Sequence, residues 1–228
     1  MQNSETIWQE SRLGYFTASN IWKLLKSGRD KDKVFGETAL TYIDEKIAEI
    51  ITGEHKDSAN TFATEWGRNN EADAVKWYEM KYKTKITHYG GLIPEYFAYN
   101  DISGGSPDGL SEDGKAVIEV KCPFNTCNHL EYIIKYQELT PLEFESWFYK
   151  EHFDYYAQMQ FNMMCCNVDM AVFISYDPRV IDHELRMFET VFVQDDIVRQ
   201  NIKDRIELAS QIVKDKLAKL EAFKETFN

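Results

Sequence analysis

The segment from Ser106 to Lys121 constrains the fold of this chain more than any other stretch. Its centre carries Asp113-Gly114 between two apolar runs, and Asp-Gly in that setting is a strong signal for a tight β-hairpin. Side chains alternate between the two faces of a strand, so Glu119 and Lys121 share one face of the second strand. Pro123 lacks the N–H that a ladder needs, and it ends that strand. The sequence therefore predicts a hairpin with two charged side chains on one side.

This hairpin carries the residue types that hold a divalent cation beside a phosphodiester. Asp108 and Glu119 supply carboxylates, and Mg²⁺ takes one or two carboxylates together with water and phosphate oxygens. Lys121 can orient or deprotonate an attacking water and offset phosphate charge, provided that its surroundings lower its pKa. The alternative is a surface hairpin with solvated carboxylates and an ion-paired lysine. The turn Ser106-Pro107-Asp108-Gly109, the apolar neighbours of Glu119 and an acidic helix upstream favour the metal site.

At 228 residues the chain is long enough for a full core, and it contains no repeat or Pro/Gly-rich linker. We therefore expect a single domain, 1–228, with N-terminal helices and a long C-terminal helix. No apolar stretch approaches the length of about 18 residues that a membrane span needs, and the first residues do not resemble a signal peptide. The cysteines show no C-x-x-C spacing (Cys122, Cys127, Cys165 and Cys166). Reduced cysteines and a cytoplasmic location are the expectation.

The net charge of −12, from 26 basic and 38 acidic residues, argues against a protein that coats nucleic acid indiscriminately. It does not exclude an enzyme that confines Lys and Arg to one groove and neutralises its carboxylates with metal. One short basic stretch is either a solvated loop or a contact to a duplex backbone (Lys26, Arg29, Lys31 and Lys33).

Hydrophobic periodicity outlines the remaining elements. It predicts helices at 37–52 with Gly53 as C-cap, at 61–82, at 148–165 and from Asp195 onward, with a further helix start at 17–19. Strands are expected at 168–176 and 188–193, a strand or hairpin at 86–99, and mixed helix and loop at 126–150. This order predicts an α/β (α+β) fold with a mixed central β-sheet flanked by helices.

Five motifs occur in an order that is typical of one nuclease family. They are Arg12-Leu13-Gly14 with Thr17-Ala18-Ser19, Trp66-Gly67 with Glu71, Ser106-Pro107-Asp108-Gly109, Glu119-Val120-Lys121-Cys122-Pro123-Phe124, and Tyr155-x-Ala157-Gln158-x-Gln160. With these motifs the chain resembles the PD-(D/E)xK nuclease superfamily and, within it, the phage λ-exonuclease family, also called YqaJ-like viral recombinases. The resemblance covers roughly residues 8–180 and implies a restriction-endonuclease-like core.

The resemblance implies a 5′→3′ exonuclease that digests one strand of linear double-stranded DNA and leaves a 3′ single-stranded overhang. It implies that Glu71, Asp108, Glu119 and the Val120 carbonyl hold Mg²⁺, with Mn²⁺ as a substitute. Lys121 would serve the attacking water, and Gln158 would contact the water or the phosphate. A separate set would grip the 5′-phosphate (Arg12, Ser19 and Ser106), where a guanidinium fork suits a dianionic end.

The same resemblance implies partners and an origin. Members of the family commonly form a homotrimer ring around DNA and work with a single-strand-annealing recombinase protein. The expected setting is the cytoplasm of a bacterial host, with a phage or prophage gene, and no membrane partner. The chain departs from one related subtype, the helicase-nucleases, because Asn162 stands where that subtype has a tyrosine.

Other interpretations stay open at this point. Trp66 and Trp77 are expected in the core rather than as base-stacking platforms, and Phe62 is either a core residue or a strand-separating wedge. A structure-specific or restriction-type endonuclease on the same core is one alternative function. A non-catalytic module that binds DNA ends is another, although the complete set of Asp108, Glu119 and Lys121 argues against it.

Overall fold

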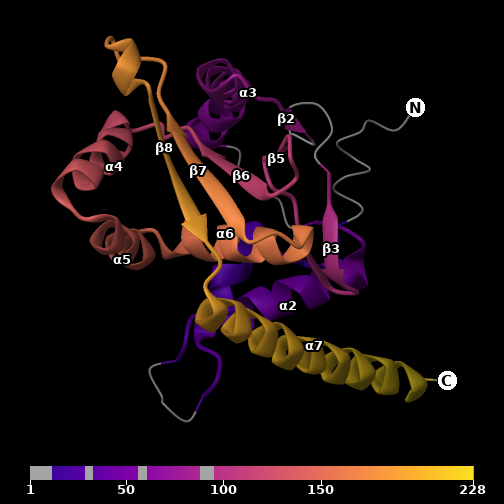
Figure 1. Ribbon diagram of the computed structural model, residues 1–228. Helices are drawn as coiled ribbons and strands as arrows, with labels where there is room; N and C mark the ends of the chain where they lie inside the picture. The colour runs from indigo at the N-terminus through magenta and orange to yellow at the C-terminus, as the bar shows by residue number, and fades with distance from the viewer. Residues whose placement is uncertain (1–11, 29–32, 56–60, 88–94, 228) are drawn as a thin grey trace, which may run out of the picture.

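A computed structural model describes residues 12–28, 33–55, 61–87 and 95–227 of the chain (Figure 1). Its α-helices are, in chain order, α2 (Glu37–Thr52), α3 (Phe62–Tyr82), α4 (Thr126–Glu138), α5 (Pro141–Glu151), α6 (Phe153–Cys166) and α7 (Asp196–Glu225). Two short 3₁₀ helices accompany them, η1 (Ala18–Lys23) and η2 (His183–Leu185). Within the described ranges, no helix is both long and apolar enough to cross a membrane.

The strands of the described residues form two sheets. The larger sheet has the order β2-β5-β6-β7-β8, with bounds Ile86–Thr87, Gly109–Ser111, Ala116–Lys121, Met170–Tyr176 and Met187–Val193. The smaller sheet has the order β1-β4-β3, with bounds Phe16–Thr17, Ser103–Gly105 and Phe97–Asn100. β6 pairs with β7 in parallel, while the other pairs of the larger sheet are antiparallel. The predicted mixed central sheet is therefore confirmed.

Helices cover both faces of the larger sheet, as the alternation along β6 requires. Val117 packs in one core with β7 and with α4, α5 and α6, and Phe173 of β7 belongs to the same core. Ile118 and Val120 point the other way, into a second core that contains Val75 of α3. Figure 1 shows α6 crossing one face of the sheet and α3 lying near the upper ends of the strands. β6 is consequently buried from two sides by different helices.

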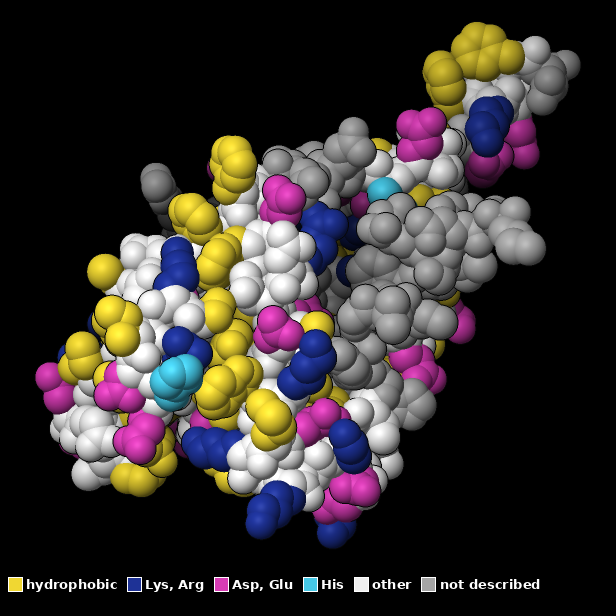
Figure 2. All heavy atoms as spheres, turned by 90° about the horizontal axis from the view of Figure 1, so that it is seen from above, with side chains coloured by type: hydrophobic (Ala, Val, Ile, Leu, Met, Phe, Trp, Pro, Cys, Tyr) yellow, Lys and Arg dark blue, Asp and Glu magenta, His cyan; other side chains and the backbone are white. Residues whose placement is uncertain are grey.

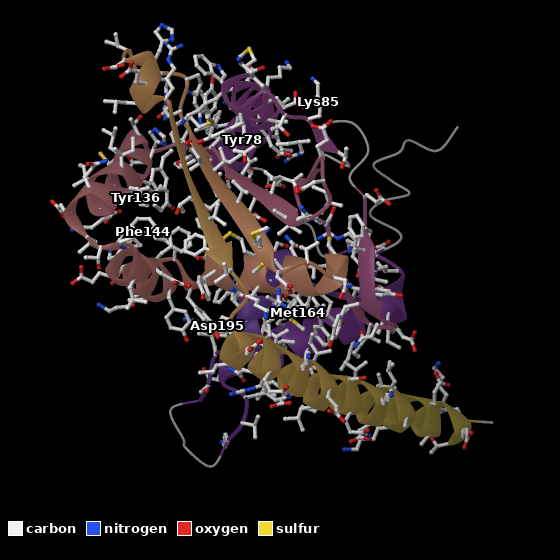
Figure 3. All side chains as sticks on the ribbon, viewed as in Figure 1. Tyr78, Lys85, Tyr136, Phe144, Met164 and Asp195 are labelled. Carbon is white, nitrogen blue, oxygen red and sulfur yellow. The ribbon has the colours of Figure 1, made fainter. Side chains whose placement is uncertain are left out.

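Several helix boundaries follow the predicted caps. α2 ends at Gly53, whose φ of 71° lies in the left-handed region that glycine adopts without strain. α3 begins with a capping box between Thr61 and Thr64. At the start of α7 (Figure 3) the Asp195 carboxylate accepts hydrogen bonds from the first free backbone N–H groups of the helix.

The predicted helix at 148–165 is wrong at its start. The structure has two helices, because His152 adopts a non-helical backbone (φ −127°, ψ 43°) that ends α5 and precedes α6. α5 begins earlier, at Pro141, behind a capping box between Thr140 and Glu143. Aromatic residues on both helices point into the same core, so the apolar pattern continues across the break and hides it.

The region 126–150 is more helical than expected, since only Leu139 and Thr140 separate α4 from α5. Both helices pack on the end strand β8 through aromatic rings. Tyr136 of α4 and Phe144 of α5 lie 5.4 and 5.8 Å from the Phe188 ring (Figure 3).

Two other expectations are only partly met. The helix start at 17–19 is a 3₁₀ helix without a side-chain cap, since Phe16 and Thr17 pair as strand β1. In the segment 86–99 the structure contains β2 and the first part of β3, and residues 88–94 lie outside the described residues.

Candidate active site

The predicted hairpin is formed by β5 and β6, and it fixes Asp108 beside the middle of β6. The backbone N–H of Asp108 donates to the Ile118 carbonyl at 3.0 Å. In return, the backbone N–H of Val120 donates to Oδ2 of the Asp108 carboxylate at 2.6 Å. These two bonds bracket Glu119, so the two acidic residues of the motif are held next to each other by the ladder itself.

Glu119 is almost completely buried, with 1% of its surface exposed, and both of its oxygens are used. Oε1 accepts from Lys121 Nζ at 2.5 Å, and Oε2 accepts from Asn162 Nδ2 at 3.2 Å. Burial raises the pKa of Glu119 to about 7, and the attraction of Lys121 opposes that shift. The carboxylate is thus fixed from two sides, by its own strand and by α6.

Lys121 is placed by the residues around its amine. Nζ lies 3.4 Å from Gln158 Oε1 and 4.7 Å from the centre of the Tyr155 ring. Burial disfavours the ammonium, but the carboxylates of Glu119 and Asp108 outweigh burial and raise the pKa of Lys121. Without a cation, Lys121 therefore does not have the lowered pKa that a general base requires.

Glu71, on α3, interacts electrostatically with Asp108, Glu119 and Lys121 although it lies far from them in the sequence. Burial, together with the negative charges of Asp108 and Glu119, raises its pKa to about 8. For Asp108 the direction is the same, and burial is the main cause. α3 and α6 pack on opposite faces of the larger sheet, so Glu71 and Gln158 approach β6 from two sides.

The donor set suits a hard divalent cation that also keeps water ligands. In the part of the chain that the structure describes, no three acidic, His or Cys side chains are arranged to hold a metal ion by themselves. Mg²⁺ does not need such a cage, because it binds through one or two carboxylates and retains several waters. The charges of Asp108 and Glu119 raise the pKa of Glu71, and the charge of Asp108 also raises that of Glu119; a cation between these carboxylates would relieve the repulsion. The contribution of the Val120 carbonyl stays a prediction.

Two residues that shape this site were not predicted from the sequence. Asn162, fully buried on α6, was noted only as a departure from a subtype, yet it binds Glu119. Gly105 at the end of β4 makes room for it, because a Cβ there would lie 2.2 Å from Asn162 Oδ1. The available signal was the position of Asn162 one helical turn after Gln158, on the same helix face.

The proposed 5′-phosphate residues come together through the smaller sheet. β1 and β4 are parallel, and Thr17 pairs with Gly104. Ser19 and Ser106 each follow these paired residues by two positions, so they leave the sheet at the same end. Ser106 donates a hydrogen bond to the Glu95 carbonyl at 2.6 Å, whereas Ser19 is exposed to solvent. The sheet therefore brings Ser19 near Ser106, and the latter leads directly into Asp108.

Arg12 lies just before β1 in a partly buried setting of tyrosines and charges. Burial lowers its pKa, while Tyr96, Tyr42 and Glu49 favour the charged form. Glu49 is itself buried and accepts from Lys46 Nζ at 2.8 Å. Arg12 is thus one of two cations next to a buried carboxylate, and its role toward a 5′-phosphate stays a prediction.

Basic side chains are scattered over the upper face. Figure 2 views the molecule from above, the side on which β6 and β7 end, and shows Lys and Arg spread over that face and mixed with Asp and Glu, with a few of them near its middle. In the basic stretch, Arg29 and Lys31 lie outside the described residues, and Lys26 lies near the rings of Trp22 and Phe153. Of the two roles left open for Phe62, the structure excludes the core residue, since 84% of the side chain is exposed. Trp66 and Trp77 are partly buried against the second core, as expected.

The mixed sheet, the flanking helices and the carboxylate–lysine group on one hairpin define a nuclease with a restriction-endonuclease-like core. Comparison with known proteins agrees with this class. The family model described as YqaJ-like viral recombinase domain matches residues 7–169. The chain belongs to this family, and it is a nuclease of the viral recombinase exonuclease type. A search of curated proteins gave no match.

Solved structures of exonucleases resemble the whole chain. An alkaline exonuclease (LHK-Exo) from Laribacter hongkongensis has a TM-score of 0.77 and 26% identity, over 98% of this chain and 100% of that one. The same values hold for a structure of LHK-Exo in complex with dAMP. A phage related exonuclease from Haemophilus somnus 129PT has a TM-score of 0.70 and 17% identity, over 90% of this chain and 96% of that one, and shows the same fold.

Proposed function

We propose that this protein is a Mg²⁺-dependent 5′→3′ exonuclease that degrades one strand of linear double-stranded DNA and leaves a 3′ overhang. The contact that carries the proposal is the 2.5 Å hydrogen bond from Lys121 Nζ to Glu119 Oε1. It joins an ammonium to a buried carboxylate. This carboxylate lies next to Asp108 in the β-ladder, and its charge raises the pKa of Glu71.

Glu71, Asp108, Glu119 and the Val120 carbonyl are the groups that would hold the cation, with Mn²⁺ as a substitute for Mg²⁺. When bound, the cation would act as a Lewis acid toward the scissile phosphate and its attacking water. The carboxylates supply the negative charge that retains it, and Asn162 keeps Glu119 in a fixed orientation.

We assign to Lys121 the action on the water and the phosphate. Its pKa is raised in the metal-free site, so it enters the reaction as an ammonium that donates hydrogen bonds and offsets charge on the phosphate. Removal of a proton by Lys121 requires that a cation first neutralise the carboxylates around it. Gln158, at 3.4 Å from Nζ, orients the amine or the water.

The direction of digestion depends on recognition of the 5′ end. Arg12, Ser19 and Ser106 are the groups we assign to the 5′-phosphate. The parallel pairing of β1 with β4 supports this assignment, because it leads Ser19 and Ser106 away from the sheet at the same end. The LHK-Exo structure with dAMP supports a nucleoside monophosphate as the product of each step.

The assembly and the partner follow from the same proposal. A homotrimer ring would keep the enzyme on linear DNA between cuts, and a single-strand-annealing recombinase would take up the exposed 3′ strand. Two alternative functions remain as outcomes of the test. One is a structure-specific or restriction-type endonuclease, and the other is a non-catalytic module that binds DNA ends.

The test compares a 5′-phosphorylated linear duplex with the same DNA as a closed circle, each in Mg²⁺ and in EDTA. We expect mononucleotides from the 5′ ends of the linear form only, and no product in EDTA. Lys121→Ala should abolish cleavage and retain binding to DNA ends, whereas Lys115→Ala, on the exposed turn of the same hairpin, should cleave normally. Cutting of the closed circle would identify an endonuclease, and binding without products would identify a binding module.

A further inference from the structure

An aromatic pair with one exposed ring and one partly buried ring lies near the proposed active site. Phe124 follows β6, and 52% of its surface is exposed. Its ring meets the Trp66 ring of α3 edge to face, with centroids 6.2 Å apart. We call Phe124 and Trp66 the aromatic platform.

Arg179 holds the aromatic platform from behind. Its guanidinium lies 4.2 Å from the centre of the Trp66 ring and donates to the Phe124 carbonyl at 2.8 Å. The same guanidinium is fixed by Asp177, whose fully buried carboxylate it contacts at 2.7 Å. The Nε1 of Trp66 has no hydrogen-bond partner among the described residues, so packing rather than hydrogen bonding sets the ring plane. The platform is therefore held rigid before any ligand arrives.

The platform is continuous with the proposed metal site along two chain segments. Phe124 lies three residues after Lys121, which is the last residue of β6. Trp66 lies five residues before Glu71 on α3, which corresponds to about 7.5 Å along the helix axis. Both rings therefore lie only a few residues along the chain from residues of the proposed metal site.

We propose that the aromatic platform stacks an unpaired nucleobase of the substrate next to the scissile phosphate. This inference rests on the proposed nuclease function and adds a binding site for the base to it. A half-exposed phenyl ring with a fixed backing suits a planar partner. Stacking tolerates every sequence, because each base has a π-face, and an enzyme that digests DNA of any sequence needs such tolerance. It also stabilises a base that has left its pair at the end of a duplex.

The test removes the ring and the base separately. Phe124→Ala and the matched control Phe223→Ala are compared, since Phe223 is also exposed and meets Phe227 edge to face at the far end of α7. The substrates are 5′-phosphorylated duplexes with one abasic residue at each of the three terminal positions of either strand. On intact DNA, Phe124→Ala should lower kcat/KM about 5- to 100-fold, mainly through KM. Phe124→Tyr should restore it, and Phe223→Ala should change it less than about twofold.

The decisive result comes from combining the protein change with the DNA change. When the abasic residue replaces the base that stacks on Phe124, kcat/KM of the wild-type enzyme should fall by the same factor as Phe124→Ala causes on intact DNA. On that abasic substrate, Phe124→Ala should lower kcat/KM no further. A second readout needs no cleavage: 2-aminopurine at that position should be quenched on binding in Ca²⁺ by wild type and not by Phe124→Ala. Equal losses in Phe124→Ala and Phe223→Ala, or a loss that persists at every abasic position, would overturn the stacking site. Absence of cleavage by wild type would instead reject the proposed function.

Discussion

Asn162 and Glu119, which are 43 residues apart in the chain, are joined by a buried hydrogen bond of 3.2 Å. The Asn162 amide donates to the carboxylate oxygen that Lys121 does not use. A helix therefore fixes the orientation of a carboxylate that stands on the neighbouring strand. The proposed cation site depends on this contact as much as on the acidic residues themselves.

Asn162→Ala should weaken metal use without abolishing DNA binding. Loss of a partner that orients a metal-binding carboxylate commonly costs about 10- to 100-fold in affinity or activity. We expect activity to fall by that factor and the Mg²⁺ concentration for half-maximal activity to rise, while binding to DNA ends in Ca²⁺ stays unchanged. Asn128→Ala, an exposed asparagine on α4, is the control. An unchanged Mg²⁺ requirement would remove Asn162 from the account.

Gly105→Ala should damage the same contact by crowding. The new Cβ would lie 2.2 Å from Asn162 Oδ1, so the amide that binds Glu119 has to shift. Overpacking of this kind costs about 1–3 kcal/mol of folding stability. The double change with Asn162→Ala should be less damaging than the sum of the two single changes, as chemical denaturation would measure. Strict additivity would mean that the two residues do not press on each other.

The metal-free carboxylates should make stability fall as the pH rises. In the folded protein the pKa of Glu71 is raised to about 8 and that of Glu119 to about 7, from the ordinary value of 4.5. Between about pH 4.5 and 8 the folded state therefore binds more protons than the unfolded chain, and stability falls with increasing pH.

Thermal unfolding in EDTA should accordingly show a lower Tm at pH 8.5 than at pH 6.5. Mg²⁺ should raise the Tm more at pH 8.5, because its ligands must be deprotonated. Glu71→Gln should reduce both effects, whereas Glu112→Gln, at an exposed residue whose carboxylate accepts a hydrogen bond from the Lys85 N–H, should not. A Tm in EDTA that rises between pH 6.5 and pH 8.5 would contradict the raised pKa values of Glu71 and Glu119.

Arg12→Ala should reduce the preference for 5′-phosphorylated over 5′-hydroxyl ends. A guanidinium donates two parallel hydrogen bonds to a phosphate, and the ammonium of Lys keeps the charge but cannot form this pair. Arg12→Lys should therefore restore the preference only in part. The measurement is the ratio of digestion rates on the two duplexes, with Tm as a check on folding because Arg12 is partly buried. A ratio equal to that of wild type would place the 5′-phosphate elsewhere.

The local features of the site could be predicted from the sequence. Asp113-Gly114 indicated the hairpin, and alternation put Glu119 and Lys121 on one face, opposite Val120. The cap at Asp195 correctly predicted the start of α7. Each of these predictions depends on neighbours within a few residues, where chain geometry leaves few alternatives.

Contacts between distant elements could not be predicted in this way. The bond between Asn162 and Glu119 depends on how α6 crosses the sheet, and the raised pKa of Lys121 depends on two carboxylates at once. The break at His152 was hidden because α5 and α6 bury aromatic residues in one core. In each case tertiary packing, rather than local pattern, decides the outcome.

The central claim is that Glu71, Asp108 and Glu119 share a divalent cation next to Lys121. Crystals soaked in Mn²⁺ and measured by anomalous diffraction test it most directly. We predict a Mn²⁺ peak within about 2.0–2.6 Å of carboxylate oxygens of Asp108 and Glu119, with Glu71 bound directly or through water. A peak bound elsewhere, or carboxylates that stay too far apart to share the ion at saturating Mn²⁺, would contradict the account.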